Sequence, residues 1–199
     1  MYQHYKEGWL EVISGCMFAG KTEELIRRIK TLEYGKKKIK VFKPSIDNRY
    51  SLSQIASHSG YKVTCHTIET ASDILKHLED DDQVIAVDEV QFLDNSIIEI
   101  AEALADKGKR VILAGLDRNF RGEVFGPMAE LMIRAEFVTK LAAVCVVCGA
   151  PATRTQRIIE GTPASYNDPT VLVGATDSYE PRCRHCHVVL NKPRKINIK

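Results

Sequence analysis

The sequence predicts an α/β fold, in which helices cover both faces of a mostly parallel sheet. Strand-like and helix-like segments alternate along residues 1–144, which is typical of parallel strands joined by helices. Two strand-like segments, Val84–Val87 and Val111–Ala114, are apolar throughout, as in strands that are buried on both faces. A glycine-rich loop near the N-terminus also stands between a strand-like segment and a helix-like one.

The other elements follow from hydrophobic periodicity. Trp9–Ile13 is a short apolar run that suits a buried strand, and the apolar residues of the segment from Leu25 to Leu32 fall on one face of a helix. The same reasoning predicts strands at Ile39–Lys43 and, more weakly, Tyr61–Ile68, helices at Ala71–Leu78, Ile97–Leu104 and Met128–Ala135, and a last strand at Glu136–Val144.

The composition argues against several classes of function. The chain has 199 residues, 44% of them apolar, and a formal net charge of +2. That charge is too small to indicate nucleic-acid binding through bulk electrostatics. No run approaches the roughly 18 apolar residues of a membrane helix, and the N-terminus lacks the apolar stretch of a signal peptide. We therefore expect a cytoplasmic protein that binds neither nucleic acid nor a membrane.

The last quarter of the chain has a different character. Residues 149–169 contain scattered polar residues and prolines with little periodicity, and Val171–Val173 is the only strand-like piece. A segment this short buries little core and needs an additional staple. We therefore expect an α/β domain at residues 1–144 and a small separate domain at residues 145–199.

Two matched pairs of cysteines supply such a staple. Cys145 and Cys148 form one C-x-x-C pair, and Cys183 and Cys186 form the other. Four thiolates complete the tetrahedral shell of a structural Zn²⁺ ion and leave no open position for a substrate. Four buried cysteines without a metal are the plainer alternative. The remaining cysteines, at positions 16 and 65, are assigned no metal role.

The glycine-rich loop predicts a nucleotide site. It reads G-x-x-x-x-G-K-T, and its residues are Gly15, Cys16, Met17, Phe18, Ala19, Gly20, Lys21 and Thr22. In loops of this pattern the backbone N–H groups surround the phosphates, the lysine contacts the β- and γ-phosphates, and the hydroxyl binds Mg²⁺.

Two acids follow the buried strand Val84–Val87. An aspartate in the place of Asp88 is the usual partner of Mg²⁺ in such enzymes. Because side chains alternate along a strand, Asp88 is expected to face the metal and Glu89 to face the acceptor or a water. There Glu89 can act as general base. This chemistry describes either a kinase or an ATPase.

Several motifs together resemble the cellular-type (type II) thymidine kinases. They are the glycine loop with Met17-Phe18, Phe42-Lys43-Pro44-x-x-Asp47-x-Arg49-Tyr50, Asp88-Glu89-x-Gln91-Phe92, Ala114-Gly115-Leu116-Asp117-x-x-Phe120-Arg121-Gly122, Gly174-x-x-x-x-Tyr179-Glu180 and the four paired cysteines. The resemblance covers nearly the whole chain. It implies a P-loop (RecA-like) sheet with a small zinc-binding domain. It also implies transfer of the γ-phosphoryl of ATP to the 5′-hydroxyl of thymidine, and of deoxyuridine, in deoxynucleotide salvage.

The resemblance also implies roles for individual residues. ATP would be bound by the glycine loop from Gly15 to Thr22 and by Asp88, Glu89, Val90 and Gln91. Asp88 and Asp47 would hold Mg²⁺, Arg49 would stabilise phosphoryl charge, and Glu89 would be the general base. The thymine pocket would consist of Met17, Phe92, Leu116, Phe120, Phe125, Val173, Gly174 and Tyr179.

Further expectations rest on the resemblance alone. A lasso loop at about residues 153–174 would close over the base, the protein would be a homotetramer, and thymidine triphosphate (dTTP) would inhibit it. Two positions depart from the family pattern. Ala19 replaces the usual serine where the backbone does the binding, and Val124 replaces a proline that commonly precedes the pocket residue Phe125, which could loosen that side chain.

Two other functions fit part of the pattern. A P-loop ATPase that contacts DNA through a zinc ribbon would need a basic stripe on its surface. A nucleotide-binding regulatory module would not need Glu89. The small net charge and the aromatic residues in the predicted sheet loops favour the nucleoside kinase.

Overall fold

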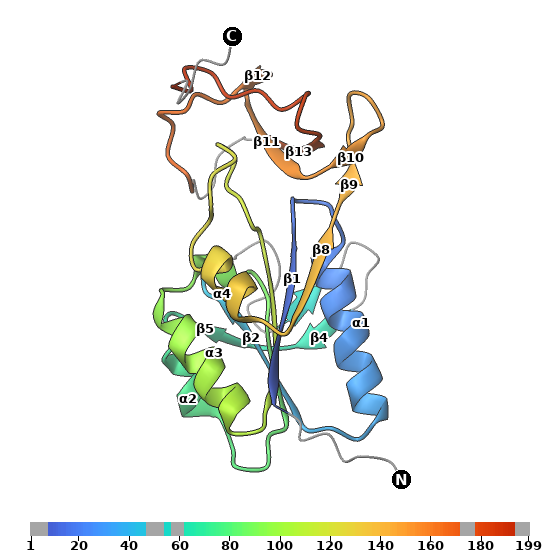
Figure 1. Cartoon of the computed structure of the whole chain (residues 1–199), viewed down its shortest axis with the longest axis vertical. Coiled ribbons are helices and arrows are strands. Elements are labelled where there is room, and N and C mark those ends of the chain that lie inside the picture. Colours follow the sequence, from blue (N-terminus) through green and yellow to red (C-terminus); the bar gives the residue numbers. More distant parts are fainter. Residues whose placement is uncertain (1–7, 47–53, 57–61, 172–177, 194–199) are drawn as a thin grey trace.

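A six-stranded parallel sheet forms the centre of the molecule (Figure 1). The structure is a computed structural model and describes residues 8–46, 54–56, 62–171 and 178–193. The strand order is β5-β2-β6-β7-β1-β8, and every neighbouring pair is parallel. The predicted α/β class is therefore confirmed. The strands are β1 (Trp9–Gly15), β2 (Ile39–Pro44), β5 (His66–Ile68), β6 (Val84–Val87), β7 (Arg110–Gly115) and β8 (Phe137–Leu141).

Helices cover both faces of this sheet, as the apolar strands β6 and β7 require. One face is covered by α1 (Lys21–Tyr34), whose residues Leu25, Ile26 and Ile29 pack on strand residues of a common cluster. The other face is covered by α2 (Asp73–His77), α3 (Ser96–Asp106) and α4 (Met128–Arg134) (Figure 1). The helices predicted from periodicity are all present, with boundaries within a few residues of those expected.

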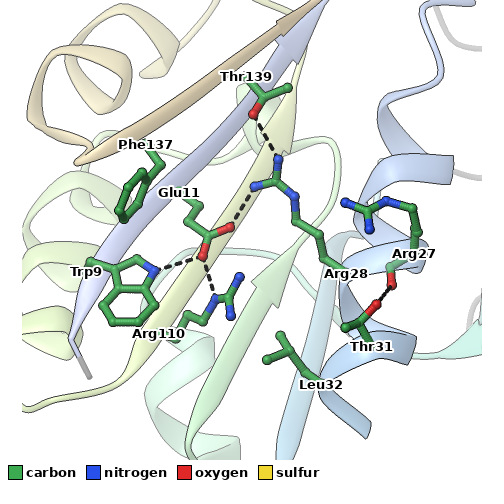
Figure 2. Close-up of a pocket in the computed structure, with 9 residues that line it drawn as sticks. All are labelled: Trp9, Glu11, Arg27, Arg28, Thr31, Leu32, Arg110, Phe137 and Thr139. Atoms are coloured by element: carbon green, nitrogen blue, oxygen red, sulfur yellow. Dashed lines mark hydrogen bonds and ion pairs between the residues drawn. The ribbon is translucent and has the colours of Figure 1, made fainter. Parts of the chain in front are cut away.

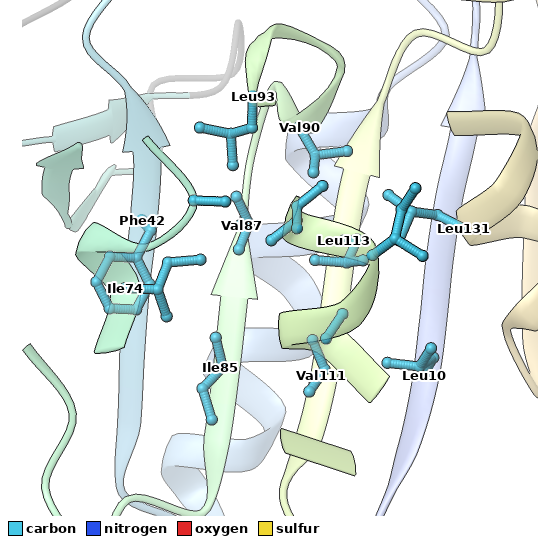
Figure 3. Packing of buried hydrophobic residues seen from close by; sticks show 14 of the residues in the cluster. Leu10, Phe42, Ile74, Ile85, Val87, Val90, Leu93, Val111, Leu113 and Leu131 are labelled. Carbon is cyan, nitrogen blue, oxygen red and sulfur yellow. The ribbon is translucent and has the colours of Figure 1, made fainter. Parts of the chain in front are cut away.

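The larger core cluster lies under the second group of helices (Figure 3). Alternate strand residues such as Leu10, Ile85 and Val111 point into it, and Ile74 of α2 and Leu131 of α4 close it. Fully burying a side chain of this size contributes about 1.5–3 kcal/mol. The cluster thus fixes β6 and β7, whose carboxyl ends carry the candidate site.

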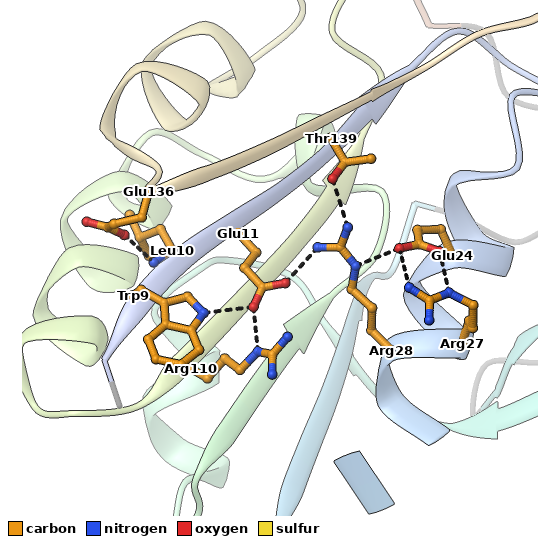
Figure 4. Close-up of polar contacts among 9 residues, drawn as sticks. All are labelled: Trp9, Leu10, Glu11, Glu24, Arg27, Arg28, Arg110, Glu136 and Thr139. Atoms are coloured by element: carbon orange, nitrogen blue, oxygen red, sulfur yellow. Dashed lines mark hydrogen bonds and ion pairs between the residues drawn. The ribbon is translucent and has the colours of Figure 1, made fainter. Parts of the chain in front are cut away.

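A buried carboxylate joins α1 to three strands (Figure 4). Glu11 of β1 accepts hydrogen bonds from Arg28 Nη1 of α1 at 2.6 Å and from Arg110 Nε of β7 at 2.5 Å. Arg28 Nη2 also donates to Thr139 Oγ1 of β8 at 2.8 Å. Burial opposes ionisation of Glu11, but the hydrogen bonds from Arg110 and Trp9 outweigh it and lower the pKa of this carboxyl. This network orients α1, the helix that begins at the glycine loop.

A cavity of about 430 Å³ lies beside the same network, between α1 and the β8 edge of the sheet (Figure 2). Its walls combine the arginines 27, 28 and 110 with the aromatic rings of Trp9 and Phe137. The Arg28 and Arg110 side chains are already bound to Glu11. The polar groups of this cavity therefore serve the packing of α1 on the sheet.

The segment after the central sheet holds small antiparallel sheets, and here the sequence expectation was wrong. Residues 149–169 were expected to lack strands, yet they contain β10 (Pro151–Ala152), β11 (Arg154–Ile159) and β12 (Thr162–Pro163). The three buried residues of β11 are consecutive and polar, Thr155, Gln156 and Arg157, so no apolar alternation marks the strand. β11 pairs with β12 and with β13 (Ser178–Arg182).

Two predicted strands divide into pairs. The expected last strand is interrupted at Ala142, so that β8 stays in the central sheet and β9 (Ala143–Val144) pairs with β10. The weak strand expected at residues 61–68 becomes β4 (Lys62–Thr64), which pairs with β3 (Gln54–Ala56), and β5 of the central sheet. Val171, expected in a strand, lies outside any strand.

No helix among the described residues is long and apolar enough to cross a membrane.

Candidate active site and zinc centre

The glycine loop leaves the carboxyl end of β1 and enters α1. Gly15 has φ +155°, and a Cβ there would lie 2.6 Å from the carbonyl oxygen of Leu141. Gly20 has φ +81° and comes directly before the first residue of α1. The two glycines therefore allow a close backbone turn at the helix N-terminus, where backbone N–H groups and the helix dipole favour an anion.

Lys21 and Thr22 begin α1 and face different partners. The Nζ of Lys21 donates to the carbonyl oxygen of Cys16 at 2.9 Å, within the loop itself. The Oγ1 of Thr22 donates to Asp88 Oδ2 at 3.0 Å. Burial, and then the charge of Glu89, raise the pKa of Asp88 to about 7. A buried acid beside a threonine hydroxyl, with its ionised form disfavoured, fits a position that a bound Mg²⁺ would neutralise.

Asp88 and Glu89 are separated by a turn rather than by strand alternation. β6 ends at Val87, and Glu89 has a left-handed backbone with φ 52° just before the short 3₁₀ helix η1 (Val90–Phe92). The expected alternation of the two acids along a strand was therefore wrong, although their side chains still have different partners. The main-chain N–H of Glu89 donates to Asp88 Oδ1 at 3.0 Å, and Glu89 Oε2 accepts from Gln91 Nε2 at 2.5 Å.

The predicted pocket residues gather around the loop between β7 and α4. Leu116, Phe120 and Phe125 belong to this loop. The ring of Phe125 meets Phe92 of η1 edge-on, with centroids 5.4 Å apart. Phe120 is buried, and the guanidinium of Arg157 lies 5.3 Å from its ring centroid. An aromatic wall thus stands next to the turn that carries Glu89.

Other predicted pocket residues come from elsewhere in the chain. Tyr179 of β13 pairs with Arg157 of β11, which brings it toward Phe120. Met17 belongs to the glycine loop itself. Asp47, Arg49, Val173 and Gly174 lie outside the described residues. The structure therefore groups the described candidates at the carboxyl end of the sheet and on the strands that face it.

The four paired cysteines converge. Their sulfur atoms all lie within 4.8 Å of one another, and the Sγ atoms of Cys148 and Cys183 are 3.6 Å apart. Thiolates that bind one Zn²⁺ tetrahedrally at 2.3 Å lie about 3.8 Å from each other. The thiol of Cys186 donates hydrogen bonds to the sulfurs of Cys183 and Cys148, which keeps the proton on Cys186 and raises its pKa to about 12. Four sulfurs that cannot all ionise by themselves suit a divalent cation, so this cluster can hold zinc.

The region that carries the four paired cysteines touches the glycine loop directly. The Sγ of Cys16 donates to the carbonyl oxygen of Ala152 at 3.2 Å, and the main-chain N–H of Met17 donates to Thr155 Oγ1 at 3.0 Å. Cys16 also packs in one buried cluster with Cys145 and Cys183. The sequence reasoning missed Thr155 and Arg157, because polar residues in an unpatterned segment gave no signal of a buried strand.

The comparison with protein families agrees with the motifs. The chain matches the family model described as "Thymidine kinase" over residues 8–187. Among solved structures, one described as "ATPase" aligns with 96% of this chain and 86% of its own length, at 13% sequence identity and a TM-score of 0.48. At that identity and TM-score, the second match says nothing of what this chain binds or does.

Proposed function

The chain belongs to the thymidine kinase family, and from this premise we propose that it transfers the γ-phosphoryl of ATP to the 5′-hydroxyl of thymidine, giving dTMP and ADP. The observation that supports the proposal most directly is a juxtaposition. The Oγ1 of Thr22, at the end of the glycine loop, donates a hydrogen bond to Asp88. The neighbouring Glu89 is bound to Gln91, which in turn accepts a hydrogen bond from Leu116 of the loop that also carries Phe120 and Phe125. The candidate phosphate site at the glycine loop is therefore followed in space by the carboxylate of Glu89 and then by the aromatic pocket.

Each of these residues has a task in the proposed reaction. The backbone of the glycine loop and Lys21 would bind the triphosphate, and Thr22 and Asp88 would hold Mg²⁺. The metal would offset charge on the β- and γ-phosphates when bound. Glu89 would accept the proton of the attacking 5′-hydroxyl. The aromatic wall would place that hydroxyl in line with the γ-phosphorus, and such positioning accounts for much of the rate enhancement in phosphoryl transfer.

The first test is ADP release from Mg-ATP with each of the four common deoxynucleosides and with deoxyuridine. Release with thymidine, less with deoxyuridine and none with the purine nucleosides is the expected result. Release that depends on added DNA, with no response to any nucleoside, would overturn the kinase proposal in favour of an ATPase that acts on nucleic acid.

The Glu89→Gln variant tests the proposed general base. Removing a general base lowers the rate by about 10²–10⁴, so kcat should fall by that factor while the KM for ATP stays near its original value. A kcat close to that of the unmodified enzyme would refute the role of Glu89.

The finer expectations complete the proposal. We propose a structural Zn²⁺ on the four cysteines, two domains at residues 1–144 and 145–199, a homotetramer, and inhibition by dTTP. Cytoplasmic deoxynucleotide salvage, with deoxyuridine as a second acceptor, is proposed on the same basis. Asp47 and Arg49 are proposed to act on the metal and the phosphoryl group, and Val173, Gly174 and Tyr179 on the base.

A further inference from the structure

The side chain of Gln91 uses both ends of its amide inside the protein. It lies in η1 and is 3% exposed. Its Nε2 donates to Glu89 Oε2 at 2.5 Å, and its Oε1 accepts from the main-chain N–H of Leu116 at 3.0 Å. The orientation of the amide follows from these partners, because a main-chain N–H can only donate and an ionised carboxylate can only accept. Gln91 therefore links the candidate base, Glu89, to Leu116, the first pocket residue of the loop between β7 and α4.

The pocket loop also begins and ends against this residue. A Cβ on Gly115 would lie 2.6 Å from Gln91 Oε1, and a Cβ on Gly126 would lie 2.3 Å from the main-chain oxygen of Gln91. At Gly115 the Gln91 side chain would have to move to admit a Cβ, whereas at Gly126 the obstacle is backbone and φ is +52°, so glycine is required there. Leu116 directly follows the first glycine and Phe125 directly precedes the second. The ends of the loop are thus held against residue 91.

Glu89 needs such a partner. Its backbone is left-handed, with φ 52°, a conformation that is uncommon for residues other than glycine and is found mostly where surrounding contacts enforce it. The Gln91 amide is one contact that fixes the carboxylate within this turn. A general base displaced by about 1 Å from its working position would contribute much less to the reaction rate.

We infer that Gln91 is a positioning residue, which orients the Glu89 carboxylate and ties it to the nucleoside-binding loop. The sequence-based expectation placed Gln91 in the ATP site, whereas both ends of its side chain are directed to protein groups. This inference rests on the proposed kinase function. It predicts that Gln91 acts on turnover through Glu89 and contributes little to ATP affinity.

A double-mutant cycle tests the inference. Gln91→Leu removes both hydrogen bonds. Gln91→Glu keeps the acceptor for Leu116 but removes the donor to Glu89, so it serves if the leucine variant does not fold. Each substitution should lower kcat by about 10- to 100-fold, the loss typical of a hydrogen bond to a charged group, and leave the KM for ATP within about twofold. In a Glu89→Gln background, Gln91→Leu should lower the residual kcat by less than about threefold.

Two further readouts separate this role from a merely structural one. In Gln91→Glu, two adjacent carboxylates would compete for a proton, so the acid limb of the kcat–pH profile should move to higher pH. In ¹⁵N-labelled protein, the side-chain NH₂ resonance of Gln91, identified by its loss in Gln91→Leu, should shift as Glu89 titrates. That shift should be absent in Glu89→Gln.

Several results would overturn the inference. They are an unchanged kcat in a folded variant, equal loss of kcat in both backgrounds, or a raised KM for ATP with kcat unchanged. If the chemical shift of the Gln91 side-chain NH₂ does not change as Glu89 titrates in active enzyme, the contact itself is refuted. A separate outcome is that the unmodified protein phosphorylates no nucleoside while that resonance still shifts with the titration of Glu89. In that case the contact is confirmed, and both the proposed function and the role of Gln91 in turnover are refuted.

Discussion

Replacing Thr155 with valine is expected to weaken ATP binding, although Thr155 and the loop residue that it contacts are 138 positions apart in the sequence. Thr155 Oγ1 accepts a hydrogen bond from the main-chain N–H of Met17 at 3.0 Å. Valine has nearly the same shape as threonine but no acceptor. The substitution would therefore leave a backbone donor of the phosphate-binding loop without its partner while preserving the packing around residue 155.

The magnitude follows from the burial of the contact. Thr155 is 4% exposed, so water cannot easily replace its hydroxyl. An unsatisfied buried donor costs about 1–3 kcal/mol. Because Met17 itself is only partly buried and the loop can adjust, we expect the lower part of that range. A loss of about 1–2 kcal/mol corresponds to ATP affinity that is weaker by about five- to thirtyfold.

Isothermal titration of ATP into the two matched variants, Thr155→Val and Thr155→Ser, measures this effect. Serine keeps the hydroxyl and should bind ATP within about twofold of the unmodified protein. Thermal unfolding of both variants would show that each is folded. Equal ATP affinity for the valine and serine variants would refute the idea that this hydrogen bond supports the loop.

Three further predictions concern the metal sites and the aromatic wall. Without Mg²⁺, the raised pKa of Asp88 means that its folded form holds a proton that the unfolded chain loses near pH 4, so stability falls as the pH rises from about 4 to 7. Asp88→Asn should therefore have a free energy of unfolding at pH 8 that is higher than that of the unmodified protein by an amount on the order of 2–4 kcal/mol, with a smaller advantage at pH 5. A loss of stability at pH 8 in denaturant unfolding would contradict this. Removing zinc with a chelator should abolish thymidine binding and also weaken ATP binding, because the cysteine cluster packs on the glycine loop; normal thymidine binding by calorimetry in protein shown to be metal-free would disprove the coupling. Phe92→Ala should raise the KM for thymidine about tenfold by removing the edge-on partner of Phe125, and an unchanged KM would show that Phe92 only packs the core.

Part of the site could be predicted from local sequence. The glycine loop, the two acids after β6 and each C-x-x-C pair are short patterns in which local spacing brings the groups together. The meeting of the two cysteine pairs depends on the tertiary structure. Their predicted roles in binding and catalysis still await the tests above. The turn at Glu89 shows the limit of such reasoning. Strand alternation predicted opposite sides for the two acids, but the strand ends at Val87, and Glu89 itself adopts a left-handed backbone that turns its side chain to a different partner.

The sequence by itself determined the fold class, because hydrophobic periodicity records which side of each segment faces the core. Only the tertiary structure decided what surrounds the candidate site. The acceptor for the main-chain N–H of Met17 is Thr155, 138 positions away in the sequence, and Gln91 joins Glu89 to Leu116 on a different segment. Such contacts become visible only when separate segments meet. β11 was missed for the same reason, since its buried side chains are satisfied by hydrogen bonds to other segments rather than by apolar contacts that leave a pattern.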